Sequence, residues 1–297
     1  MSFINVMMKK LRFLILLAFN FICFWVNASV DSLDVPSPSM NKTYKAGVVL
    51  PASYANNKTS YPVLYLLHGG GGHFRSWLIQ PPNKQLVQNV ANQFNIIIVM
   101  PEGEPFGWYL DSPFNLENKF ETHVINEVIP KIDQTYRTVK NKKGRVISGL
   151  SMGGHGAMYL STRHPDLFCA AGSMSGALDM NFSKYRVDKA FNQSLKERFL
   201  KLLGTDDPTT ELYTKNSVIN MIDKIKQNGL AITIDCGVDD FLLDVNREFH
   251  NRLVYHNIPH DYTERPGAHT WEYWENSLPY HALFFHKVLK SNGVAVE

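Results

Sequence analysis

Short apolar runs recur along the chain, and within each run the apolar residues are consecutive rather than alternating with polar ones. Each run stops at or near a glycine or a proline. Both properties are typical of strands that are buried on both faces of a sheet. The pattern predicts core strands over residues 63–67, 96–100, 145–148, 169–173, 231–236 and 260–264, with an edge strand over residues 44–50.

Between these runs, apolar residues recur at helical spacing. The predicted helices cover residues 83–93, 118–134, 152–163, 241–255 and 271–289. Because strands and helices alternate, we expect one α/β domain over residues 44–297, with a mostly parallel sheet and helices on both faces. Residues 181–216 are polar and fit this alternation poorly. They are predicted to be an insertion over the carboxyl edge of the sheet, a candidate lid.

The first 28 residues have the pattern of a secretory signal peptide. Three basic residues precede a largely apolar stretch that ends at Val26-Asn27-Ala28, a small-residue cleavage site. The apolar stretch is short for a bilayer span. We therefore expect removal of residues 1–28 and a secreted or periplasmic protein, with an uncleaved anchor as the alternative. Residues 29–43 are polar and are predicted to be a loose leader ahead of the domain.

The net charge of +3 comes from the predicted signal peptide. Residues 1–28 hold three of the 30 Lys and Arg residues and no acidic residue, which leaves 27 basic and 27 acidic residues in the remainder. No basic run or stripe remains, so nucleic acid is not an expected partner. No membrane association is expected after the signal is removed, and the oligomeric state is left open.

Two cysteines follow the predicted cleavage site, Cys169 and Cys236. The strand prediction puts them at opposite ends of parallel strands, on the order of 15 Å apart at ~3.3 Å per residue. That separation is beyond the reach of a disulfide, so we expect two buried free thiols. The chain has neither a C-x-x-C pair nor a His/Cys cluster, so no metal or cofactor is predicted.

The most informative local pattern is Gly149-Leu150-Ser151-Met152-Gly153, a G-x-S-x-G motif between a predicted strand and a predicted helix. In such a strand–turn–helix, the turn is so tight that bulk is excluded from the flanking positions. The serine is then exposed at the start of the helix. Ser151 is therefore the predicted catalytic nucleophile.

A nucleophilic serine needs a base, and the base needs an acid that orients it. In this architecture the chain order is serine, acid, histidine. The acid is expected after the strand 231–236, where Asp239 and Asp240 follow each other. We favour Asp240, because one more residue clears the turn and Asp239 can then cap the next helix. The base is expected in the last loop before the final helix, which contains His269.

An oxyanion hole needs two N–H donors. One is expected from Met152 and the other from the glycine loop 69–72, with Gly70 favoured. A phosphate loop is disfavoured because no Lys-Ser/Thr follows the glycines, and His68 is interpreted as a brace for the loop. His155 lies four residues after the predicted nucleophile and is interpreted as a packed helix histidine, with a supporting role near the nucleophile as the alternative.

Aromatic residues gather near the same predicted edge. Trp108 and Tyr109 lie beyond the end of the strand 96–100, where a ligand would sit in this architecture. Trp274 follows the predicted base by five residues. These three residues are predicted to line the substrate site, with core packing as the alternative.

Six segments together carry a resemblance to a known family: PVLYLLHGGGGHFRSW, GWYLDSP, GLSMGGHG, Ser175-Gly176-Ala177-Leu178, CGVDDFLLDVNREF and PGAHTWEYW. Over residues 44 to the terminal helix, the chain resembles the esterase D family of α/β-hydrolases. It is most similar to secreted acetyl and tributyrin-type esterases and to feruloyl and acetylxylan esterases of carbohydrate esterase family one. The resemblance implies an α/β-hydrolase fold, a triad of Ser151, Asp240 and His269, and oxyanion donors at Gly70 and Met152. His155 departs from the aromatic or small residues common at its position.

These observations predict a secreted serine esterase that acts through an acyl-enzyme. The expected substrates are short acyl or feruloyl esters, small molecules or plant polysaccharide. An acyltransferase that uses the same triad is one alternative. A non-catalytic binding module with the same fold is the other.

Overall fold

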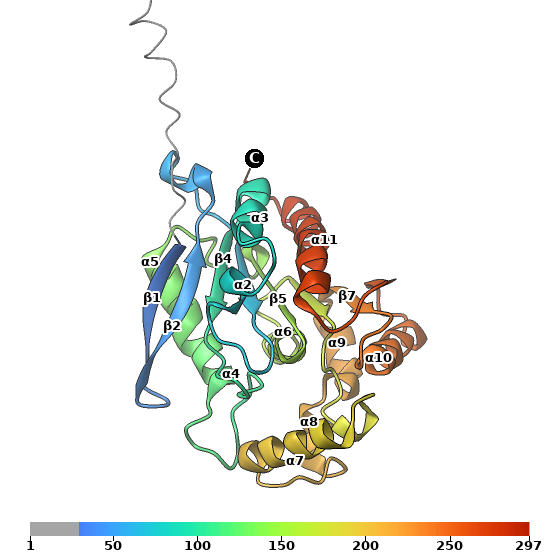
Figure 1. The fold of residues 1–297 in the computed structure, drawn as a ribbon. Helices are drawn as coiled ribbons and strands as arrows, with labels where there is room; N and C mark the ends of the chain where they lie inside the picture. Colours follow the sequence, from blue (N-terminus) through green and yellow to red (C-terminus); the bar gives the residue numbers. More distant parts are fainter. Residues whose placement is uncertain (1–29, 297) are drawn as a thin grey trace, which may run out of the picture.

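The computed structural model describes residues 30–296, so the predicted signal peptide lies outside the described residues. In this part of the chain eight strands form one sheet, in the order β1-β2-β4-β3-β5-β6-β7-β8 (Figure 1). Only the pairs β1–β2 and β2–β4 are antiparallel, which confirms the predicted mostly parallel sheet. The strands are β1 (Val30–Ser37), β2 (Lys42–Val49), β3 (Val63–Leu67), β4 (Ile97–Pro101), β5 (Arg145–Leu150), β6 (Ala170–Met174), β7 (Ala231–Gly237) and β8 (Asp261–Arg265).

The central strands are buried on both faces, as their unbroken apolar runs predict. Along β3, Val63, Tyr65 and Leu67 pack into the core on one face, and Leu64 and Leu66 pack into the core on the other. This alternation follows from the pleat, which turns successive side chains to opposite faces.

Helices cover both faces of the sheet (Figure 1). The apolar residues of α3 and α11 belong to one core, and those of α5, α6, α9 and α10 belong to the other. The helices are α2 (Ser76–Ile79), α3 (Leu86–Phe94), α4 (Phe120–Thr122), α5 (Ile129–Thr135), α6 (Met152–Arg163), α7 (Lys189–Leu203), α8 (Glu211–Asn216), α9 (Ile222–Asn228), α10 (Leu243–Tyr255) and α11 (Trp271–Ser291). A π-helical turn over His123–Val128 joins α4 to α5, within the single helix predicted over residues 118–134.

Two expectations at the start of the domain are wrong. Residues 30–37 are not a loose leader, because they form β1, which pairs with β2 along its whole length. β2 is therefore the second strand of the sheet and not its edge. The missed signal is the one-sided alternation of Leu33 and Val35, which pack against the core while Asp34 between them is exposed. Pro36 is compatible with an edge strand, where a missing N–H costs no ladder hydrogen bond.

The polar segment 181–216 lies between β6 and β7 and contains α7 and α8, which sit together at one end of the molecule (Figure 1). Asp188 caps α7 by accepting a hydrogen bond from the N–H of Phe191, and Gly204 ends the helix at a φ of 77°. α7 turns Leu195, Phe199 and its last two leucines into the core. Whether the segment moves as a lid stays a prediction.

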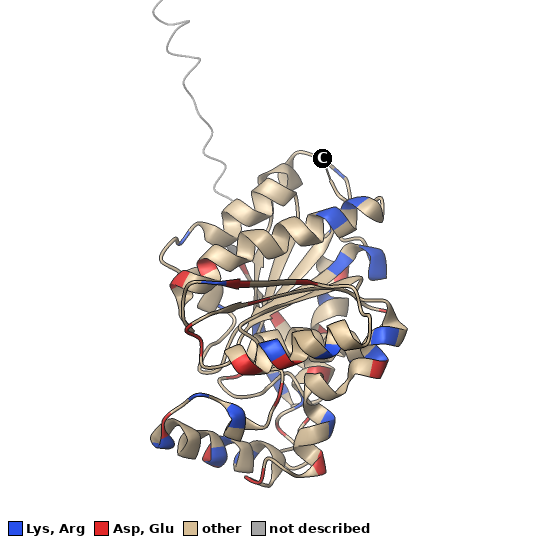
Figure 2. Ribbon diagram, turned by 90° about the vertical axis from the view of Figure 1, so that its right-hand side faces the viewer, with Lys and Arg blue, Asp and Glu red and all other residues tan. Residues whose placement is uncertain are grey.

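Basic and acidic residues are both scattered over the ribbon in Figure 2, and most of the two upper helices is uncharged. Within residues 30–296, no helix has the length and apolar character to cross a bilayer. Cys169 and Cys236 are free thiols, as predicted, but only Cys236 is buried, and Cys169 is half-buried directly before β6. Burial raises the pKa of the Cys169 thiol to about 11, so the thiol is protonated at neutral pH.

Candidate active site

The turn between β5 and α6 holds Ser151 in a conformation that few residues adopt. Its φ is 54° and its ψ is −118°, and its side chain stands at the start of α6. The glycines on either side are required by close contacts. A Cβ on Gly149 would lie 2.5 Å from the carbonyl of Gly153, and a Cβ on Gly153 would lie 2.5 Å from the carbonyl oxygen of His68. Only glycine fits at these two positions without a backbone shift.

The structure brings Ser151, His269 and Asp240 into one hydrogen-bonded chain. His269 Nε2 lies 2.9 Å from Ser151 Oγ, and His269 Nδ1 lies 2.8 Å from Asp240 Oδ2. An ionised carboxylate can only accept a hydrogen bond, so Nδ1 carries the proton and Nε2 is left to accept one from the serine hydroxyl. The Asp240 side chain is fully buried, which shields this arrangement from water.

Asp239 is exposed and does not cap the next helix. The first turn of α10 begins after Leu242, and no side chain caps it. Instead, the second oxygen of Asp240 accepts a hydrogen bond from the N–H of Leu242 at 2.8 Å. The choice of Asp240 thus agrees with the contacts, but the capping role expected of Asp239 is wrong. One carboxylate both orients the histidine and fixes the turn ahead of α10.

The two residues predicted to supply oxyanion donors, Gly70 and Met152, line one cavity together with Ser151. Met152 is the first residue of α6, so its N–H has no acceptor within the helix. In the glycine loop, the N–H of Gly71 donates to Pro105 and that of Gly72 donates to Gly69. No hydrogen bond from the N–H of Gly70 occurs within residues 30–296. Both N–H groups are thus left without a protein acceptor in this part of the chain, and their role as an oxyanion hole stays a prediction.

His68 braces the glycine loop. Its Nδ1 lies 2.9 Å from the carbonyl oxygen of Gly69, and its Nε2 accepts a hydrogen bond from the N–H of Gly103 at 3.0 Å. The same Nε2 lies 3.3 Å from Glu102 Oε1, so the brace also includes this carboxylate.

Tyr109 does not reach the site, which corrects the sequence prediction. It is fully buried, and its hydroxyl bonds to the backbone N–H and C=O of His68. A Cβ on Gly103 or Gly156 would touch its ring at 2.5 Å or less. The φ values of Trp108 and Tyr109 are both positive, 54° and 53°. This tight bend sends only Trp108 toward Ser151, and Tyr109 packs beneath the loop.

Two cavities meet at Ser151. The first, here named the apolar cavity, has a volume of about 250 Å³, and its lining includes Phe106, Trp108, Met152, Leu195, Arg198 and Phe241. The second, here named the polar cavity, has a volume of about 490 Å³, and its lining includes Gly70, Gln80, Thr270, Trp271, Glu272 and Trp274. Trp108 and Trp274 therefore both lie at the site, one in each cavity.

Two aromatic rings hold the imidazole of His269. The ring of Phe241 lies 4.4 Å from it between centroids, and that of Trp274 lies 4.8 Å from it in an edge-on arrangement. No sequence pattern singles out Phe106, Arg198 or Phe241 as a site residue. Arg198 and Leu195 reach the site from α7. No local sequence motif predicts that this helix lines the site.

His155 is a packed helix histidine, as interpreted from the sequence. It is fully buried, and its Nε2 donates to the carbonyl oxygen of Asn216 at 2.8 Å. Its ring stacks on Tyr159 and meets Trp108 edge-on. Burial lowers the pKa of His155 to about 4, so the ring is neutral near pH 7.

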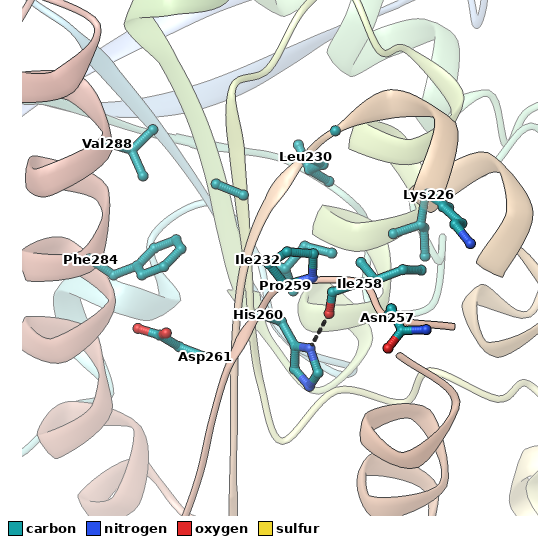
Figure 3. A pocket seen from close by; sticks show the side chains of 13 residues that line it. Lys226, Leu230, Ile232, Asn257, Ile258, Pro259, His260, Asp261, Phe284 and Val288 are labelled. Carbon is teal, nitrogen blue, oxygen red and sulfur yellow. Dashed lines mark hydrogen bonds between the residues drawn. The ribbon is translucent and has the colours of Figure 1, made fainter. Parts of the chain in front are cut away.

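A further cavity of about 410 Å³ lies away from this site, at the amino ends of β7 and β8 (Figure 3). Phe284 and Val288 of α11 form one side, and Leu230, Ile258 and His260 lie on the other. It contains none of the predicted catalytic residues. Within residues 30–296, no cluster of three or more His, Cys, Asp or Glu side chains could hold a metal ion.

The sequence profile of the Esterase family matches residues 37–285 of this chain. The chain is 30% identical over 243 residues to an esterase of Mycobacterium tuberculosis, which covers 75% of this chain and only 52% of that protein. It therefore spans about half the length of this relative. It is also 30% identical to the acetyl esterase of Caldicellulosiruptor saccharolyticus, over 84% of this chain and 95% of that enzyme.

Other comparisons extend the range of related activities. The diacylglycerol acyltransferase/mycolyltransferase Ag85A of Mycobacterium bovis is 27% identical, over 84% of this chain and 78% of that protein. A solved ferulic acid esterase superposes with a TM-score of 0.72 at 28% identity, covering 88% of this chain and 98% of that chain. These matches confirm the resemblance stated from the sequence. The chain has the α/β-hydrolase fold and belongs to the Esterase family.

Proposed function

We propose that the protein is a serine carboxylic-ester hydrolase that acts through an acyl-enzyme. The observation that carries this proposal is the hydrogen-bonded chain from Ser151 through His269 to Asp240 at a strained turn. A strained, half-buried serine whose Oγ lies 2.9 Å from an imidazole nitrogen has the geometry of an activated nucleophile.

The chemistry follows from the positions of these groups. Ser151 Oγ attacks the ester carbonyl while His269 Nε2 accepts its proton, and Asp240 stabilises the imidazolium that forms. The N–H groups of Gly70 and Met152 bind the oxyanion of the tetrahedral intermediate. His269 then protonates the leaving alcohol, and a water molecule activated by the same histidine releases the acid.

The proposed substrates are short acyl or feruloyl esters, including esters of plant polysaccharide. Relatives named acetyl esterase and ferulic acid esterase support this class. Since an apolar cavity of about 150 Å³ holds benzene, the apolar cavity of about 250 Å³ has room for an aromatic acyl group. We assign the acyl group to this cavity and the alcohol to the polar cavity, whose side chains can hydrogen-bond to hydroxyl groups.

Acyl transfer is the second candidate activity, and the relationship to Ag85A favours it. The acyl-enzyme would be the same, and the acceptor would be a hydroxyl group in place of water. Product analysis with an added sugar or lipid alcohol separates the two activities, because a transferase forms a new ester. A non-catalytic binding module is disfavoured, because such a protein has no need for the strained serine.

The test is hydrolysis of 4-nitrophenyl acetate, 4-nitrophenyl butyrate, methyl ferulate and acetylated xylan by residues 29–297. Ser151→Ala should lower turnover by about 10⁴-fold or more, since it removes the nucleophile. If no ester is turned over while the protein is folded, the hydrolase proposal fails. Turnover that survives in Ser151→Ala would contradict the assigned nucleophile.

Two neighbouring carboxylates provide a matched pair for the orienting acid. Asp240→Asn should lower kcat by about 10²- to 10⁴-fold, because the amide disturbs the tautomer of His269. Asp239→Asn removes the same charge one residue away, at an exposed position, and should change kcat by less than about 2-fold. Similar losses in both variants would contradict the assignment of Asp240.

We further propose that the protein is exported after cleavage behind Ala28. The support is the basic and apolar pattern of residues 1–28. Mass spectrometry of the protein recovered from the periplasm or medium should give Ser29 as the first residue. Recovery of an intact Met1 in a membrane fraction would favour the uncleaved anchor instead.

A further inference from the structure

The apolar cavity has one charged lining residue, Arg198 of α7. The other side chains that surround it there are aromatic or aliphatic, among them Phe106 and Leu195. Within residues 30–296, the guanidinium of Arg198 forms no ion pair and no hydrogen bond. Arg186, in the same insertion, is by contrast paired with Asp244. Arg198 therefore brings five N–H donors to the cavity, and none of them is used by another residue in the described part of the chain.

The position of this guanidinium is defined by an aromatic ring. Its central carbon lies 5.5 Å from the ring centroid of Phe106, a distance at which a cation is attracted to the face of the ring. Phe106 in turn packs edge-on against Trp108, with ring centroids 5.7 Å apart. The charge is thus held at the cavity wall. Because Arg198 remains exposed to solvent, its charge carries little desolvation cost before a ligand binds.

A carboxylate is the group that matches this site. A planar guanidinium binds a carboxylate through two parallel hydrogen bonds, for which a hydrocarbon acyl chain has no acceptor. We propose that Arg198 binds a carboxylate at the far end of the acyl group, so that the preferred substrates are monoesters of dicarboxylic acids. This inference rests on the proposed hydrolase function and on the assignment of the acyl group to the apolar cavity.

The test uses two esters that differ only in the acyl terminus. Monomethyl glutarate and methyl pentanoate share the alcohol and have acyl chains of the same carbon number, and methanol release measures both. The wild-type protein should prefer monomethyl glutarate by about 10-fold in kcat/KM, and Arg198→Gln should remove that preference. The change should appear mainly in KM, because the contact is the same in the ground state and in the transition state. Methyl 4-carboxycinnamate and methyl cinnamate form a second pair with a longer acyl group.

Lys201→Gln is the matched control, because it removes the same charge from the last turn of α7 without lining the cavity. It should leave the ratio of the two kcat/KM values unchanged. Arg198→Glu should invert the ratio, which a general loss of folding cannot do. An equal loss in Arg198→Gln and Lys201→Gln would overturn the proposal, since it would indicate a long-range effect of charge.

The possible outcomes distinguish the role of Arg198 from the hydrolase activity itself. Hydrolysis of methyl pentanoate that depends on Ser151, with no preference between the esters of either pair, would overturn the role of Arg198 and leave the hydrolase proposal intact. If the folded protein hydrolyses none of these four esters and none of the esters of the earlier panel, the hydrolase proposal itself fails. A preference for a charged alcohol, tested with acetylated glucuronic acid against acetylated glucose, would place the anion in the polar cavity and also overturn the proposal.

Discussion

The turn that carries Ser151 and the insertion over residues 181–216 contribute to the same cavity by different physical means. The turn is fixed by local sterics, because Gly149 and Gly153 leave no space for a side chain. The insertion is fixed by tertiary packing, because α7 buries Leu195 and Phe199 against the domain and turns Arg198 toward the cavity. The proposed chemistry thus depends on a short motif, while the proposed wall of the acyl site depends on a helix whose sequence has no motif.

Substitution at the turn should have the largest effect on stability. Gly153→Ala places a Cβ 2.5 Å from the carbonyl oxygen of His68, so the strand and helix must separate. We expect a loss of at least about 3 kcal/mol in the free energy of unfolding, measured by urea denaturation. Gly70→Ala is the control, because its nearest contact would lie at 3.9 Å. Equal stability of the two variants would show that the turn tolerates bulk.

The hydrogen bond of His155 to Asn216 joins the two regions, and its contribution to the free energy of unfolding should depend on pH. His155 of α6 donates to Asn216 at the end of the insertion, and burial lowers its pKa to about 4 from an ordinary value of 6.5. Above pH 6.5 the ring is neutral in both folded and unfolded chains. Between pH 6.5 and about pH 4 the unfolded chain binds a proton that the folded chain does not, so stability falls as the pH falls.

Over that window, the wild-type protein should lose about 3 kcal/mol more of its free energy of unfolding than His155→Gln does. Urea denaturation at pH 4, 5, 6 and 7 measures the two slopes. Parallel slopes for both proteins would mean that His155 titrates normally in the folded state.

Removing a contact that anchors the insertion should have the smallest effect on the free energy of unfolding. The buried carboxylate of Asp179 accepts a hydrogen bond from the N–H of Asn181 and another from the hydroxyl of Ser217, and it pairs with Lys184 at 2.8 Å. Asp179→Ala should lower the free energy of unfolding by about 2 kcal/mol. It should also increase the rate of proteolytic cleavage between residues 181 and 216. Asp207→Ala, at an exposed turn within the insertion, should do neither. Unchanged cleavage in Asp179→Ala would show that other contacts hold the segment.

Most of the sheet and the chain order of Ser151, Asp240 and His269 could be predicted from the sequence, because buried parallel strands and tight turns leave local patterns. β1 was missed because an edge strand shows only a weak alternation, here Leu33 and Val35. Tyr109 was misplaced because a bend with two positive φ values separates neighbours that a pattern treats alike. The lining contributed by α7 could not be predicted, since it depends on how a helix packs over residues distant in the chain.

The hydrogen bonds of Asp179 also make residues 181–216 a segment that can be replaced as a unit by the corresponding segment of a relative. One carboxylate contacts Asn181 at the start of the segment and Ser217 directly after its end, so the two junctions lie side by side on the domain. A replacement of different length needs only to return to the same two anchor points. Acyl preference could then be exchanged between relatives as a module, with Ser151 and its partners left untouched.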